Sequence, residues 1–153
     1  MNHDNVASLL NDKAKAILVS VAPTEMVADA VRTMNREKIG AVVVLDQNAL
    51  AGIFTERDVL VRVVGGGLDP LKTRVSEVMT AAVRSVEPAT PIGDALKLMS
   101  EGRYRHLPVR ENGRVLGMIS MGDATRWVIR CQQEEFDAAI GAVKRMGYSN
   151  RRG

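Results

Sequence analysis

Cysteine, aromatic residues and long apolar runs are scarce in this 153-residue chain, and each scarcity narrows the possibilities. The single cysteine, Cys131, excludes an internal disulfide framework. The longest apolar run, residues 40–45, is too short to span a bilayer. Residues 1–12 contain two Asp and lack the apolar segment of a secretory signal, so we expect a cytoplasmic protein. Only five residues are aromatic although 46% are apolar, so the core must be mainly aliphatic.

The net charge of +3 belongs to the C-terminal tail. Four of the 21 basic residues lie in the last ten positions: Lys144, Arg145, Arg151 and Arg152. The other 17, against 18 acidic residues, leave the rest of the chain with a charge of −1. A basic tail can attract phosphate or nucleic acid, but chain ends are more often simply solvated. A nucleic-acid binder is therefore an alternative and not the main hypothesis.

The sequence repeats itself after 65 residues without a gap. Matching positions include Val21 and Val86, Pro23 and Pro88, Asp29 and Asp94, Met34 and Met99, Gly52 and Gly117, and Asp58 and Asp123. Two copies are too few for a solenoid. We therefore expect the copies to pack against each other around a pseudo-two-fold axis.

Each copy has the pattern strand, helix, strand, strand, helix. In the first copy these five elements are expected at residues 16–21, 26–37, 41–45, 50–54 and 56–64. In the second copy they are expected at residues 82–86, 92–101, 106–110, 115–119 and from 123 onward. Thr24 and Thr90 are candidates to start the first helix of each copy, because a hydroxyl accepts from free N–H groups. The triple glycine at 65–67 separates the copies.

The expected fold is α/β (α+β): two tandem β-α-β-β-α units packed as a pseudo-two-fold pair, with an extra C-terminal helix. The expected divisions are an N-terminal tail (1–12), a first repeat (13–66), a second repeat (67–129), and a C-terminal helix with a basic tail (130–153). Trp127, Phe136, Ile140 and Val143 predict one apolar stripe along the last helix. That stripe either completes the core or supplies a dimer surface, and we favour the second.

One short segment keeps its polar residues in both copies, where a strand runs into a helix. The first copy has Thr55 and Asp58, and the second has Ser120 and Asp123 at the same spacing. Helix N-termini attract anions such as phosphate. A hydroxyl can donate to a phosphate oxygen, and a carboxylate can accept from both hydroxyls of a ribose. The pattern therefore indicates a ribose-phosphate site.

The same spacing is also that of an ordinary helix N-cap, and a single occurrence would favour capping. Two occurrences in one register, each three residues after a glycine (Gly52 and Gly117), favour a ligand instead.

Taken together, these segments resemble a CBS-domain pair, also called a Bateman module, over about residues 14–129. The matching pieces are Asp29-Ala30 with Met34, the segment 52–58, Val78-Met79-Thr80, the segment 105–109, and the segment 117–120 with Asp123. The resemblance implies two copies packed sheet against sheet. It also implies AMP, ADP, ATP, S-adenosylmethionine or NAD bound in two clefts between the copies, and regulation rather than catalysis.

Site roles follow from the resemblance. In one cleft Asp58 would hold the ribose and Thr55 would meet phosphate, with the adenine against Met79, Thr80 and Val83. In the other, Asp123 and Ser120 take these roles, with the adenine against Ala14, Lys15, Ile17, Gly40 and Ala41. Arg105 and His106 would reach the phosphates together with Arg57. We expect the Asp58 cleft to prefer the more highly charged phosphates.

We therefore predict a regulatory adenine-nucleotide sensor that signals to a partner protein and forms a homodimer. We expect no enzyme, no catalytic cofactor and no membrane partner, because no nucleophile–base pair is visible in the sequence. His106 has no Cys or carboxylate cluster at ligand spacing, so we expect no metal. Two alternatives remain. One is a ligand-free interaction or dimerisation module; the other is a nucleic-acid binder, against which the scarcity of aromatic residues argues.

Overall fold

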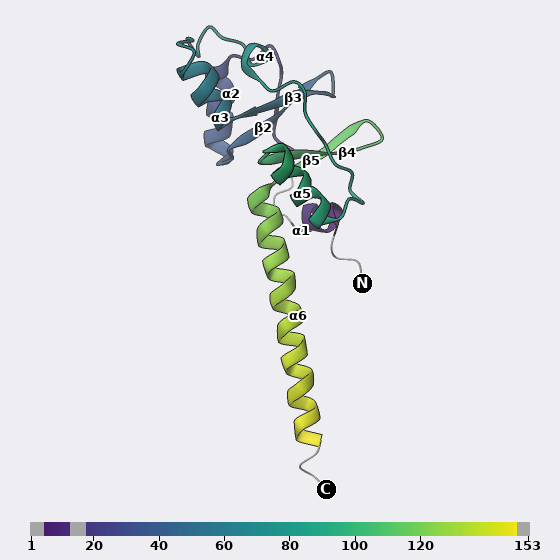
Figure 1. Ribbon diagram of the computed structural model, residues 1–153. Coiled ribbons are helices and arrows are strands. Elements are labelled where there is room, and N and C mark those ends of the chain that lie inside the picture. Colours follow the sequence, from purple (N-terminus) through teal and green to yellow (C-terminus); the bar gives the residue numbers. More distant parts are fainter. Residues whose placement is uncertain (1–4, 13–17, 150–153) are drawn as a thin grey trace.

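The computed structural model describes residues 5–12 and 18–149, and it shows two α/β units followed by a long helix (Figure 1). The expected class of fold is thereby confirmed. The elements in chain order are α1 (Val6–Asp12), β1 (Ser20–Val21), α2 (Val27–Glu37), β2 (Ala41–Asp46), β3 (Ala49–Thr55), α3 (Glu56–Asp58), the π-helix η1 (Val59–Val64), α4 (Val75–Val78), α5 (Ile92–Gly102), β4 (His106–Glu111), β5 (Arg114–Ser120) and α6 (Met121–Ser149).

The first unit is a three-stranded sheet in the order β1-β2-β3. β1 runs parallel to β2, and β2 pairs antiparallel with β3, with Val44 opposite Gly52. Helix α2 buries Val27, Ala30 and Met34, which share one face because they are three and four residues apart. These side chains pack in one cluster with strand residues such as Phe54, which is fully buried.

The second unit repeats the antiparallel pair, with Val109 of β4 opposite Gly117 of β5. The strand expected at 82–86 is wrong: only Val86 forms a parallel bridge, to Val109. Val86 donates to the carbonyl of Pro108, and Arg110 donates back to Val86. The next rung of a parallel ladder would need an N–H from Pro108 to the carbonyl of Arg84, and proline has none.

The threonines expected to start helices do not do so. α2 begins after Met26 and α5 after Pro91, and neither has a side-chain cap. The first N–H groups of α2 instead donate to backbone carbonyls of the inter-repeat segment, at Thr73 and Pro70. The inter-repeat segment, which is distant in sequence, therefore takes the place of a local cap. The spacing of residues in the sequence does not reveal such a contact.

The helix expected at 56–64 forms, but its second part widens into the π-helix η1. Its end is marked by the bond from the N–H of Gly65 to the carbonyl of Leu60, five residues back. The chain then turns through Gly67, whose φ of 64° belongs to the left-handed region that glycine adopts readily. The triple glycine therefore ends this helix, but the first unit continues beyond it, because Val75 and Val78 of α4 lie in the core cluster of the first unit.

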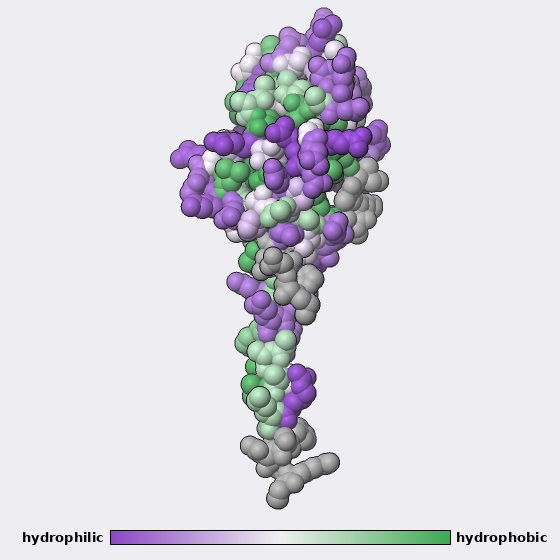
Figure 2. Space-filling model, turned by 90° about the vertical axis from the view of Figure 1, so that its right-hand side faces the viewer, coloured by the Kyte–Doolittle hydropathy of each residue, from purple (hydrophilic) through white to green (hydrophobic). Residues whose placement is uncertain are grey.

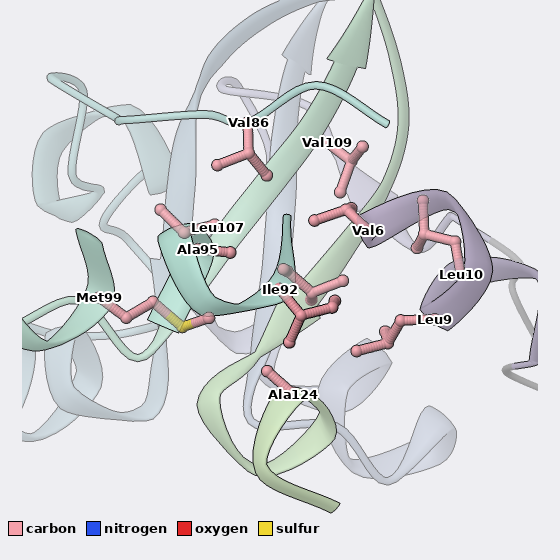
Figure 3. Packing of buried hydrophobic residues seen from close by; sticks show 11 residues of the cluster. Val6, Leu9, Leu10, Val86, Ile92, Ala95, Met99, Leu107, Val109 and Ala124 are labelled. Carbon is pink, nitrogen blue, oxygen red and sulfur yellow. The ribbon is translucent and has the colours of Figure 1, made fainter. Parts of the chain in front are cut away.

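The segment expected to be an N-terminal tail contains helix α1, which packs on the second unit. Asn5 caps it by accepting from the N–H of Ser8 at 3.0 Å. Val6, Leu9 and Leu10 lie in the core of the second unit (Figure 3). Their spacing directly after an Asn is itself a helix signal.

We expect Leu9→Ala to lower the free energy of unfolding by about 2 kcal/mol, because Leu9 is 2% exposed and its removal leaves a cavity. Chemical denaturation measures this change. Asn11→Ala, at an exposed position of the same helix, is a control for helix propensity. An unchanged midpoint for Leu9→Ala would mean that α1 does not belong to the folded unit in solution.

Within the described residues, no helix combines the length and the apolar character needed to cross a bilayer.

Candidate functional site

The two Thr/Ser-x-x-Asp segments occupy equivalent places in the two units. Thr55 ends β3 and precedes α3, while Ser120 ends β5 and precedes α6. β3 and β5 contact each other across the centre of the molecule, where the two units meet (Figure 1). The fold therefore brings both segments to the boundary between the repeats.

Asp58 is held in a capping box. Its Oδ2 accepts from the backbone N–H of Thr55 at 2.9 Å and from the Thr55 hydroxyl at 3.0 Å, while its own N–H donates to Thr55 Oγ1 at 3.3 Å. Its second oxygen, Oδ1, accepts from the hydroxyl of Thr80 at 3.4 Å and lies 3.7 Å from Nε of Arg62. The carboxylate is thus oriented by one oxygen and presents the other to Thr80 and Arg62.

Asp123 repeats this arrangement in the second unit. Its Oδ2 accepts from the N–H of Ser120 at 2.9 Å, and its N–H donates to Ser120 Oγ at 3.0 Å. Its Oδ1 forms an ion pair with Arg126 at 2.9 Å. The side chain of Asp123 is 18% exposed, against 8% for Asp58, so Asp58 is the better shielded of the two carboxylates.

The capping interpretation is therefore correct for both segments, but it leaves room for a ligand. An ionised carboxylate has about four lone-pair positions, and a cap uses those of one oxygen. A ligand at Asp58 would meet Oδ1, where the bond from Thr80 is long and the contact with Arg62 is loose. A ligand at Asp123 would compete with the tighter contact of Arg126.

A cavity of about 660 Å³ opens beside Asp58 and is lined by both units. The predicted site residues that line it are Gly40, Thr55, Arg57, Asp58, Thr80, Arg105, His106 and Ser120. Its volume falls in the range of small-molecule sites. The roles of these residues remain predictions, but their gathering around one space is a feature of the fold.

The lining of this cavity is strongly cationic. Besides His106, the lining contains five arginines: Arg57, Arg62, Arg103, Arg105 and Arg126. Among the described residues that line it, only Glu56 and Asp58 are acidic. Such a cavity attracts phosphate, because arginine offers charged, forked donors.

Three of these arginines were missed by sequence reasoning. Arg62 is placed by η1, and its Nη1 donates to the carbonyls of Val78 at 3.0 Å and Met79 at 2.6 Å. Arg126 lies one helical turn after Asp123, so its position followed from the motif once a helix was assumed. Arg103 precedes β4 and had no local signal.

A second cavity of about 410 Å³ borders Asp123, with Gly40, Ala41, His106 and Ser120 of the predicted set in its lining. Gly40, His106 and Ser120 border both cavities. Ala14, Lys15 and Ile17, assigned to this cleft, lie outside the described residues.

Two residues assigned to the Asp58 cleft, Met79 and Val83, do not line its cavity. Thr80 is fixed by two backbone bonds with Ile53 of β3, at 2.9 and 3.0 Å. Met79 turns instead toward the core of the first unit, against which its side chain packs.

No three His, Cys, Asp or Glu residues of the described chain lie close enough together to hold a metal ion.

The architecture and the paired clefts define a tandem-repeat module with a cavity between two copies of one fold. The CBS domain family matches residues 14–65 and 75–130, and the chain belongs to this family. It forms a CBS-domain pair, and CBS pairs are regulatory modules.

Relatives and solved structures agree with this assignment. The CBS domain-containing protein CBSX3, mitochondrial, of Arabidopsis thaliana is 39% identical over 81% of this chain, which spans 62% of that protein's length. The CBS domain-containing protein YhcV of Bacillus subtilis is 31% identical over 94% of this chain and 98% of its own length. A solved CBS-domain protein from Burkholderia ambifaria is 41% identical, with a TM-score of 0.80 over 82% of this chain and 94% of its own.

Proposed function

We propose that this CBS-domain pair is an allosteric sensor that binds an adenine nucleotide in the Asp58 cavity and transmits the bound state to a partner protein. The observation that carries the proposal is the cavity itself. It combines a fixed, shielded carboxylate, two hydroxyls next to helix N-termini and five arginines, all drawn from two different units.

The Asp58 cavity offers a suitable group for each part of a nucleotide. Asp58 Oδ1 accepts from the ribose hydroxyls, displacing the loose contact of Arg62. Arg62 and Arg105 then face the phosphates, and each charge-assisted bond contributes about 1.5–3 kcal/mol. Ile53 and Val61 supply apolar surface for a base.

The adenine base is proposed from the family resemblance. A more distant CBS domain protein, PAE2072 of Pyrobaculum aerophilum, was solved complexed with AMP; it is 24% identical to this chain with a TM-score of 0.69. At that identity the likeness concerns the fold, and the AMP is that protein's ligand. It makes AMP the first compound to test.

A ligand between the units also explains how a signal could arise. Binding to residues of both repeats stabilises one relative arrangement of the repeats, and a partner protein can respond to that arrangement. Because the lining is so cationic, we expect ADP and ATP to bind the Asp58 cavity more tightly than AMP.

A thermal-shift panel with AMP, ADP, ATP, NAD, S-adenosylmethionine and a GMP control tests the proposal on protein freed of co-purified nucleotide. A shift of several degrees with adenine ligands but not with GMP is expected, because a ligand at a thousandfold excess over Kd stabilises the native state by about 4 kcal/mol. The absence of any shift would reject the sensor and favour a ligand-free interaction module.

A further inference from the structure

Helix α6 continues far beyond the two units. Arg130 is the last strong anchor: its Nη2 lies 2.7 Å from Oδ2 of Asp12 in α1, and its guanidinium lies 4.8 Å from the centre of the Trp127 ring. The hydrogen bond to Asp12 raises the pKa of Arg130. Beyond it, residues 134–149 project away from the units (Figure 1).

A projecting helix of this kind needs a partner. Residues 132–140 are all exposed, so this stretch has no packed face within the chain. An isolated helix of about 16 residues is only marginally stable in water, because most helical stability in proteins comes from tertiary packing. A partner that covered this stretch would therefore add the packing that it lacks within the chain.

The exposed part of α6 carries an apolar stripe with heptad spacing. Ile129, Phe136 and Val143 recur every seven residues, and Ile140 lies four after Phe136 and three before Val143. Their exposed fractions are 61%, 62%, 66% and 41%, in the order Ile129, Phe136, Val143 and Ile140. Apolar residues gather along this helix in Figure 2. A seven-residue repeat is the pattern by which one helix packs against another.

The charged residues beside the stripe indicate which helix would pair with it and in which direction. Asp137 directly follows Phe136, and Lys144 directly follows Val143, so both lie on the same edge of the stripe. In an antiparallel pair of identical helices, this edge of one helix faces the same edge of the other. Asp137 then meets Lys144 of the partner subunit, and Lys144 meets Asp137.

We propose that the projecting part of α6 pairs antiparallel with that of a second copy of this chain. The two-fold axis passes between Gly141 and Ala142, which places Ile140 against Val143 of the partner subunit. Such an interface is isologous and closes after two copies.

The length of the helix fits this register. With the axis at that point, Glu134 lies level with Ser149 of the partner subunit. The overlap is then residues 134–149, about 24 Å long at 1.5 Å per residue. Each helix would therefore end where the globular part of the other copy begins.

A parallel pairing lacks these matches. In a parallel pair the edge with Asp137 and Lys144 on one helix faces the opposite edge of the other helix, where neither residue meets a partner of opposite charge. A parallel pairing would also crowd both globular parts at one end. Charge and shape therefore both select the antiparallel arrangement.

Sedimentation velocity over about a hundredfold range of protein concentration tests the pairing, because a dimer population rises with concentration. Ile140→Asp should weaken dimerisation at least about a hundredfold, since it buries two unpaired carboxylates next to the axis. Ala138→Asp is the matched control: it adds the same charge on the opposite face of the same helix and should change the dimer Kd by less than about threefold.

A charge swap tests the direction. Asp137→Lys and Lys144→Asp should each weaken the dimer about tenfold, and the double variant should restore it, because only antiparallel helices bring these positions together. Within one helix the two residues are two turns apart and do not meet.

Three results would overturn the proposal: a monomer at every concentration with a native circular dichroism spectrum, a dimer that Ile140→Asp leaves intact, or a double charge variant no better than the single ones. None of these depends on a nucleotide, so they are separate from failure of the sensor.

Discussion

Asp58→Ala is expected to remove most of the stabilisation that an adenine nucleotide gives to this protein. The variant loses the oxygen that would accept from the ribose hydroxyls, and two charge-assisted bonds are worth about 3 kcal/mol or more. The affinity should therefore fall about a hundredfold or more. Isothermal titration and the thermal shift with AMP both measure this loss.

The alanine variant also loses a helix cap, which by itself costs about 1 kcal/mol of folding free energy. Asp58→Asn separates the two effects. Its amide oxygen can still accept from the N–H of Thr55, but its NH₂ group replaces the acceptor that faces the cavity. The asparagine variant should fold nearly as stably as the parent and still bind nucleotide poorly.

The direction in which Asp58→Asn changes nucleotide affinity distinguishes a specific contact from general charge attraction. Removing the carboxylate makes an already cationic cavity more positive, so simple attraction of phosphate would strengthen binding. Weaker binding therefore requires a specific contact. If Asp58→Asn binds AMP as tightly as the parent does, Asp58 holds no ribose.

Asp123→Ala is the matched variant in the second cleft. Because Arg126 already occupies Oδ1 of Asp123 at 2.9 Å, we expect this substitution to affect binding less than Asp58→Ala does.

Gly52→Ala should be strongly destabilising, and Gly117→Ala, at the matching position of the second repeat, should be tolerated. A Cβ at Gly52 would lie 2.5 Å from the backbone oxygen of Thr80 and 3.1 Å from Sδ of Met79. At Gly117 the nearest atom is the Leu10 Cδ2, at 3.1 Å, and that side chain can rotate away.

The backbone at Thr80 has no such freedom, because two hydrogen bonds tie it to Ile53. We expect Gly52→Ala to lower the free energy of unfolding by about 3 kcal/mol and Gly117→Ala by less than about 1 kcal/mol. Denaturant titration of both variants measures the difference. Because Thr80 also contacts Asp58, Gly52→Ala should weaken nucleotide binding as well. Equal destabilisation by the two substitutions would contradict this account.

Local patterns were enough to predict much of the fold. Helix α2 follows from the spacing of Val27, Ala30 and Met34, and β2 follows from its β-branched run. The 65-residue repeat predicted the same elements in both copies, and the helix and the antiparallel strand pair do recur, although the first strand does not. The paired Asp58 and Asp123 followed from the same symmetry, and the fold places each beside a cavity, while their roles toward a ligand remain predictions.

Tertiary structure decided the rest, because the deciding groups are distant in sequence. The carbonyls of Pro70 and Thr73 start α2 in place of a threonine. The missing N–H of Pro108 prevents a strand at 82–86. Arg62 and Arg103 reach one cavity only because two units face each other. The sequence by itself determined the repeated unit, whose patterns are local; only packing decided how the cationic cavity is assembled and which apolar stripe stays exposed, since both depend on where the second unit lies.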